Sequence, residues 1–143
     1  RYLILSAEVT AFTVFVLQGT GQAEAYLKTV DDVVGPAMVD ELLGLYRGPG
    51  NVVSLRRNIL GSEKLGPIIR NIIKLWYYGM WYELPEAWTE AYGPAPRDIT
   101  FVVSPTAYTE GLLWKAIGAH PAGAKAPGYG SWAAPPQIPG FPD

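Results

Sequence analysis

The fold of this chain is decided by residues 67–82, which read PIIRNIIKLWYYGMWY. Apolar side chains recur in this stretch every three or four residues, as they do along one face of a helix. The wide apolar face consists of Ile68, Ile69, Ile72, Ile73, Leu75 and Trp76. Arg70, Asn71 and Lys74 fall opposite to it, and Pro67 suits the first turn of a helix. The stretch therefore predicts an amphipathic helix that packs against a core.

The same stretch ends in a dense aromatic segment. Five aromatic residues fall within residues 76–82: Trp76, Tyr77, Tyr78, Trp81 and Tyr82. So many rings cannot all face one core, and aromatic side chains are also common at protein interfaces. We therefore expect some of these rings to contact a neighbouring molecule, with Trp76, Tyr78 and Trp81 as the candidates.

Helical patterns on both sides of this stretch predict an all-α domain of four to five helices. The expected helices cover residues 7–18, 31–47, 52–60 and 67–82, with 85–92 and 109–117 as further candidates for short helices and a helical turn at 21–28. Asp31 and Asp32 are expected to cap the second of these helices, with Pro36 in its first turn. Residues 99–103 are β-branched or aromatic and predict an extended segment for which we identify no partner strand.

The last 26 residues form a segment of a different kind. Residues 118–143 contain five glycines and six prolines, a density that prevents a helix or a central strand. They carry only two charged side chains but several aromatic ones. We therefore expect a helical domain at 1–117 and a long extended arm at 118–143 that lies on an apolar surface. The interface candidates outside the central helix are Tyr108, Tyr129, Trp132, Pro135 and Phe141.

Composition narrows the range of functions. Hydrophobic residues make up 49% of the chain and charged residues only 17%, against about 25% in typical soluble domains. The formal net charge of −2 offers no basic stripe for phosphates, which argues against nucleic acid as a partner. The absence of cysteine excludes disulfides and thiolate metal sites. No apolar run reaches the length of about 18 residues that spans a bilayer.

Residues with catalytic potential are few. The single histidine, His120, has no cysteine or second histidine to complete a zinc site, and we interpret it as a surface or interface residue. Asp31 and Asp32 are interpreted as caps, with cation binding as the alternative. Glu83, Glu86 and Glu90 are interpreted as one solvated helix face, with an acid/base pair as the alternative. We predict no catalytic residue, metal or cofactor site in this chain.

Three motifs follow one another in the second half of the chain. The first, IIRNIIKLWYYG at 68–79, is a helix that ends in W-Y-x-G; the second joins Ala91-Tyr92, Arg97-Asp98 and the extended residues 100–103; the third is PGYGSWAAP at 127–135. In this order and spacing they resemble the small subunits of bacterial membrane-bound FAD-dependent dehydrogenases, which oxidise sorbitol, fructose, gluconate or glucose. The resemblance spans about residues 67–136, and residues 110–125 look inserted relative to shorter members.

The resemblance implies a complex of three subunits. A large catalytic subunit carries FAD and, in several members, an iron–sulfur cluster, and a multihaem cytochrome c subunit passes electrons to the quinone pool. This chain would be the non-catalytic small subunit, which binds no cofactor, stabilises the large subunit and assists its export through a twin-arginine signal upstream of Arg1. The expected location is the periplasm, with the inner membrane reached only through the partner subunits.

Two further hypotheses follow from the residues. The chain could be a stand-alone small-molecule binder, with Trp76, Tyr78 and Trp81 lining a pocket that the arm closes. It could also be a helical enzyme that uses Glu83 and Glu90 as an acid/base pair.

Overall fold

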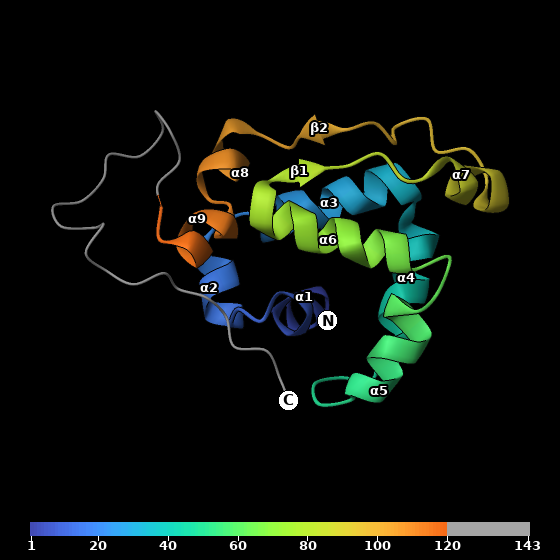
Figure 1. Cartoon of the computed structure of the whole chain (residues 1–143), viewed down its shortest axis with the longest axis horizontal. Coiled ribbons are helices and arrows are strands. Elements are labelled where there is room, and N and C mark those ends of the chain that lie inside the picture. The colour runs from blue at the N-terminus through green and yellow to red at the C-terminus, as the bar shows by residue number, and fades with distance from the viewer. Residues whose placement is uncertain (120–143) are drawn as a thin grey trace, which may run out of the picture.

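Helix α6 (Gly66–Tyr78) lies at the centre of the fold (Figure 1). The computed structural model describes residues 1–119 of the chain. Within them, α6 contacts elements from both ends of the sequence, including the first helix and the last one. Its inner face buries Ile68, Ile69, Ile72, Leu75 and Trp76. The expected amphipathic helix is therefore confirmed, although Asn71 lies on its buried face and Ile73 on its outer face.

The N-terminal half consists of short helical elements, some of which pack against α6. These elements are α1 (Tyr2–Thr10), α2 (Val14–Gly19), α3 (Ala23–Val34), α4 (Pro36–Leu45), α5 (Val52–Leu55) and a π-helical turn, η1 (Arg56–Leu60). The prediction of one helix over residues 7–18 was wrong, because the chain breaks at Ala11, whose φ of 63° is left-handed. The second helix, α2, then begins at a new cap, where the Thr13 hydroxyl accepts a hydrogen bond from Val16 N at 3.2 Å.

The expected helix over residues 31–47 is also divided. Asp31 and Asp32 lie inside α3 rather than at a helix start, so the prediction that they act as caps was wrong. The chain breaks at Gly35, because the residue before a proline is disfavoured in helical conformation. Pro36 then begins α4, so the prediction that this proline lies in the first turn of a helix is confirmed.

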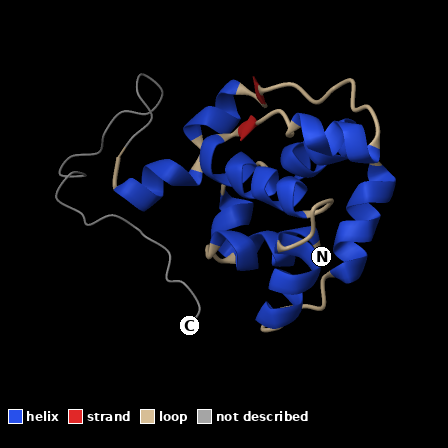
Figure 2. Ribbon diagram, turned by 45° about the vertical axis from the view of Figure 1, so that its right-hand side comes forward, coloured by secondary structure: helices blue, strands red, loops and turns tan. Residues whose placement is uncertain are grey.

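The C-terminal half contains the only strands among the described residues. Its elements are β1 (Met80–Trp81), α7 (Glu86–Tyr92), β2 (Phe101–Val102), α8 (Pro105–Thr109) and α9 (Leu112–Ile117). The two strands pair antiparallel, with Met80 opposite Val102 and Trp81 opposite Phe101. The extended segment at 99–103 is thus confirmed, but the expectation that it lacks a partner was wrong. Figure 2 shows this small pair at one edge of a helical structure.

The turn at Gly79 creates the partner strand. Gly79 ends α6 in the left-handed region with a φ of 69°, and Val103 N donates to its carbonyl oxygen at 2.9 Å. The helix was expected to continue to Tyr82, but the chain becomes extended after this glycine. The all-α class is confirmed, and the helices are shorter and more numerous than the four to five expected.

Candidate functional site

Trp76 lies in the core of the domain and not at its surface. Its side chain is fully buried, with the ring of Tyr26 edge-on at 4.9 Å between centroids and that of Tyr2 stacked at 6.3 Å. Helices α1 and α3 supply these two rings, so Trp76 joins the N-terminal helices to α6. A side chain with no exposed surface cannot contact a partner, and the assignment of Trp76 to an interface was wrong.

Trp81 is buried in the same way, on strand β1. Its indole Nε1 donates to the Asp98 carboxylate at 2.8 Å, and that carboxylate also accepts from Leu84 N at 3.0 Å. The assignment of Trp81 to an interface was therefore also wrong. A pocket lined by Trp76, Tyr78 and Trp81 is excluded as well, since two of these three side chains have no exposed surface. The sequence analysis named Asp98 only as part of a motif. In the structure it is a buried carboxyl group that accepts hydrogen bonds from two donors of the C-terminal half.

Two buried phenols stand beside Trp76. The hydroxyls of Tyr2, Ser6 and Tyr26 and the indole N–H of Trp76 are buried, and none of them makes a hydrogen bond of normal geometry. Burial is the main cause that raises the pKa of Tyr2 and that of Tyr26 above the ordinary value of 10.0. Nearby Ser6 and Trp76 lower the pKa of Tyr2, but by less. Both phenols are therefore neutral at physiological pH and suit a core rather than acid–base chemistry.

Tyr78 is the one interface candidate on α6 that reaches the surface, and its side chain is 41% exposed. It borders an open groove of about 370 Å³ on the outer side of α6, together with Arg70, Ile73, Lys74 and Tyr77. The ring of Tyr78 packs edge-on against that of Tyr82 at 6.2 Å between centroids. We call these five lining residues the α6 groove.

Tyr108 also reaches the surface, on α8. Its ring lies edge-on to that of Trp114 at 5.7 Å, and Trp114 Nε1 donates to Tyr108 O at 2.9 Å. Trp114 lines a cleft between α2 and α9, which also includes Phe15, the most exposed large apolar side chain described. Ala119, the last described residue, lies at the rim of this cleft. His120 and the arm candidates Tyr129, Trp132, Pro135 and Phe141 lie outside the described residues.

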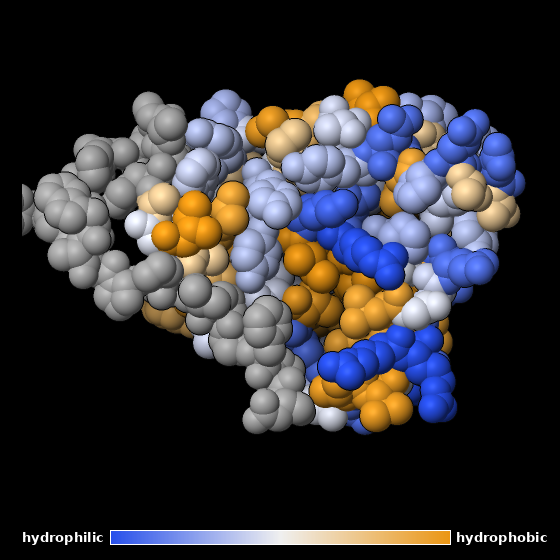
Figure 3. Space-filling model, viewed as in Figure 1, coloured by the Kyte–Doolittle hydropathy of each residue, from blue (hydrophilic) through white to orange (hydrophobic). Residues whose placement is uncertain are grey.

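A second apolar surface lies between the N-terminal helices and the turn after α4. It is a groove of about 640 Å³, lined by Ile4, Phe12, Val14, Pro49, Val52 and others. Ile4 is 43% exposed, and Val53 nearby in sequence is 70% exposed. Hydrophobic residues gather in the lower middle of the face in Figure 3, below α6 and above α5. Exposed apolar surface of this kind favours a role in protein contacts.

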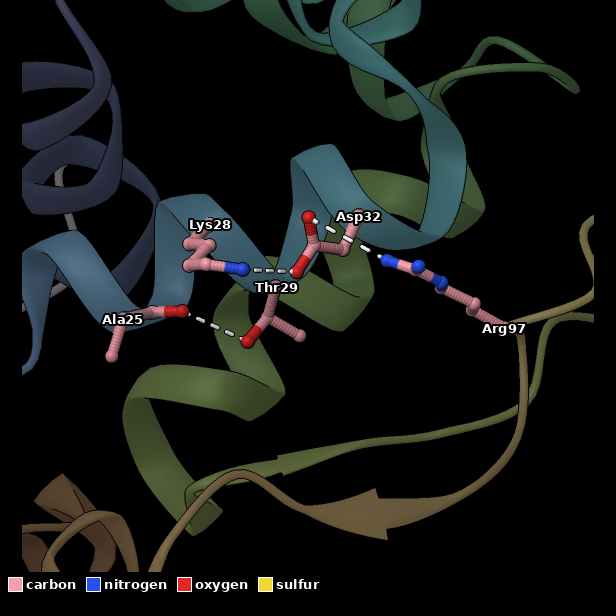
Figure 4. A network of polar contacts seen from close by, with 5 residues as sticks. All are labelled: Ala25, Lys28, Thr29, Asp32 and Arg97. Atoms are coloured by element: carbon pink, nitrogen blue, oxygen red, sulfur yellow. Dashed lines mark hydrogen bonds and ion pairs between the residues drawn. The ribbon is translucent and has the colours of Figure 1, made fainter.

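Asp32 forms ordinary surface contacts with two cations. Figure 4 shows Asp32 between two cations, with Lys28 Nζ at 2.7 Å and Arg97 Nη1 at 3.9 Å. The hydrogen bond from Lys28 is the main cause that holds the pKa of Asp32 below its usual range. Beside this pair, the Thr29 hydroxyl donates to Ala25 O at 2.8 Å. Residues 1–119 contain no group of three or more His, Cys, Asp or Glu side chains placed to hold a metal ion.

Glu83 and Glu90 do not share a helix. Glu83 lies in the loop before α7, where its N–H donates to Thr100 Oγ1 at 2.9 Å, while Glu90 lies inside α7. The expected single face with Glu86 was wrong, because α7 begins only at Glu86. Both side chains are exposed.

Comparison of the chain with models of protein families, with curated proteins and with solved structures found no match. Among the helices of residues 1–119, none combines the length and the apolar character needed to cross a bilayer. Three exposed surfaces of the described residues are the candidate functional features: the α6 groove, the cleft at α2 and α9, and the apolar groove beside α1.

Proposed function

We propose that this chain is the non-catalytic small subunit of a heteromeric FAD-dependent dehydrogenase that oxidises a sugar, polyol or other alcohol. Its role is to bind and stabilise the flavin-bearing large subunit and to assist its export to the periplasm. The order and spacing of the three motifs at 68–79, 91–103 and 127–135 carry this proposal. The exposed apolar side chains of Phe15 and Val53, at 84% and 70%, agree with a chain that binds another protein.

The positions of the first two motifs suit a scaffold for an interface. The motif at 68–79 forms the central helix, and Asp98 of the second motif fixes the strand that follows it. The core is thus organised by the same residues that carry the resemblance, while Tyr78 and Tyr108 remain on the surface. In this proposal the third motif, at 127–135, supplies further aromatic contacts to the large subunit.

Co-expression with the FAD-bearing large subunit of a dehydrogenase of this family tests the proposal. An affinity tag on this chain should retain a protein with the absorption spectrum of bound FAD, and the isolated flavoprotein should lose activity faster on warming than the complex does. The alternative, a stand-alone small-molecule binder, predicts a monodisperse monomer in sedimentation that retains no flavoprotein. A monodisperse monomer that retains no flavoprotein would overturn the proposal.

A variant that ends at Ala119 tests the arm separately. Retention of flavoprotein by this variant at the level of the full chain would show that residues 120–143 are not needed for docking. Trp132→Ala is the sharper change, and we expect it to weaken association by about 2 kcal/mol, as a central aromatic contact does.

A further inference from the structure

The outer side of α6 carries an amphipathic stripe that stays partly exposed in the described chain. The five residues of the α6 groove, at positions 70, 73, 74, 77 and 78, follow the three-and-four spacing of one helix face. The stripe runs for two turns along a helix whose opposite face is already buried in the core. It combines one aliphatic and two aromatic side chains with two cations.

The two cations of this stripe have no anionic partner among the described residues. Lys74 lies over the ring of Tyr82, with 4.9 Å between Nζ and the ring centroid, and Arg70 donates to the carbonyl of Leu60 at 3.3 Å. Helix α6 contains no Asp or Glu, and like charges four residues apart on a helix repel each other. Figure 3 shows hydrophilic residues directly beside hydrophobic ones over α6.

The aromatic walls of the groove are held in place by the fold. The Tyr77 hydroxyl donates to Thr10 O at 3.0 Å, and its ring meets that of Phe12 at 5.9 Å. Tyr78 packs on Tyr82, which in turn is fixed by two hydrogen bonds between its backbone and the Asn71 side chain. Side chains that are already ordered lose little entropy when a partner binds.

We propose that the α6 groove docks a segment of the flavin-bearing subunit in which Asp or Glu side chains flank an apolar one. The inference rests on the proposed function and adds the place and the chemistry of one contact. A carboxylate would remove the repulsion between Arg70 and Lys74, and the apolar side chain would lie against Ile73 and Tyr78. Charge complementarity favours a protein segment over a lipid surface, since membrane recognition takes clusters of about four to eight basic residues.

The test compares charge variants of the tagged chain, each co-expressed with the flavoprotein. Lys74→Glu should lower the retained flavin about tenfold or more, and Lys74→Gln should lower it less, because only the first places like charges together. Arg47→Glu is the matched control, since Arg47 is an exposed cation that belongs to no ion pair in the described residues. Circular dichroism and thermal melting confirm that each variant is folded.

Carbodiimide cross-linking gives a second readout on the wild-type complex. The reagent joins an amine to a carboxylate in direct contact, so Lys74 should be linked to an Asp or Glu of the flavoprotein. Equal flavin retention by Lys74→Glu and Arg47→Glu would overturn the groove assignment while the proposed function stood. A wild-type chain that retains no flavin would overturn both. Lys74-dependent binding to anionic phospholipid vesicles, without a cross-link to the flavoprotein, would replace the protein segment by a membrane.

Discussion

The indole nitrogen of Trp81 donates to the carboxylate of Asp98 across 2.8 Å, and both side chains are buried. The contact joins strand β1 to the turn that precedes β2, 17 residues later in the chain. The same carboxylate accepts from Leu84 N, so a single acidic group satisfies a side-chain and a backbone donor. One buried carboxyl group thus holds three segments of the chain after α6 together.

Replacement of Asp98 should destabilise the domain strongly. Asp98→Ala leaves the indole N–H of Trp81 and the backbone N–H of Leu84 buried without an acceptor, and we expect a loss of about 3 kcal/mol in the free energy of unfolding. Urea unfolding followed by tryptophan fluorescence measures this loss. Asp40→Ala removes an exposed carboxylate from α4 and should change stability by less than about 0.5 kcal/mol. Equal effects of the two variants would contradict the proposed role of Asp98.

Gly79 should tolerate no side chain. Its φ of 69° is unfavourable for other residues, and a Cβ built there would lie 2.5 Å from the carbonyl oxygen of Ala107. We expect Gly79→Ala to cost about 3 kcal/mol or more, from conformational strain and steric overlap together. Gly21 has a similar φ of 71° but open space around it, so Gly21→Ala should cost only about 1 kcal/mol. Thermal denaturation of both variants separates the two causes, and equal losses would mean that the contact with Ala107 carries no cost.

The central helix could be predicted from the sequence because a single physical signal, the spacing of Ile68, Ile72 and Leu75, decides it. The breaks at Ala11 and Gly79 were missed for different reasons. The break at Ala11 lies beside a contact with a residue far away in sequence, since the Tyr77 hydroxyl donates to Thr10 O. Local propensity carries no information about such contacts. Gly79 is itself a local signal for a helix end, but the aromatic residues after it were interpreted as a continuation of the helix.

The sequence also could not show which of the aromatic interface candidates are buried and which are exposed. Aromatic residues are common both in cores and at interfaces, so composition alone could not separate Trp76 and Trp81 from Tyr78. The structure separates them, because Tyr2 and Tyr26 from the N-terminal helices cover Trp76, and Asp98 binds Trp81. Tyr78, two residues after Trp76, faces outward because that step turns about 200° around a helix.

Tyr26 and Tyr46 should respond in opposite directions to the loss of a hydroxyl. The hydroxyl of Tyr26 is buried without a hydrogen bond, whereas that of Tyr46 donates to Glu8 Oε2. Tyr26→Phe keeps the ring contact with Trp76 and should raise the free energy of unfolding by about 1 kcal/mol. Tyr46→Phe should lower it by about 1 kcal/mol. Urea unfolding of both variants gives the comparison, and a loss of stability in Tyr26→Phe would show that its hydroxyl is hydrogen-bonded after all.

The buried phenols also predict how stability depends on alkaline pH. Burial raises the pKa of Tyr2 and that of Tyr26 in the folded state, so folding favours their neutral forms. The stability that depends on these neutral forms is fully present below the unfolded pKa of about 10 and is lost as pH rises from there through the folded pKa. We therefore expect the free energy of unfolding to fall steadily above about pH 10.

A variant that lacks both hydroxyls isolates this effect from the deprotonation of lysines, which occurs in the same range. Tyr2→Phe/Tyr26→Phe should lose stability less steeply between about pH 10 and about pH 12 than the wild type, because it has two fewer buried phenols to ionise, whereas Tyr46 is buried in both. Tyr78→Phe is the control, since Tyr78 is exposed, and its curve should run parallel to that of the wild type. Urea unfolding at several pH values measures the three slopes. If the double variant and the wild type had the same slope, Tyr2 and Tyr26 could not be the groups whose ionisation opens the core.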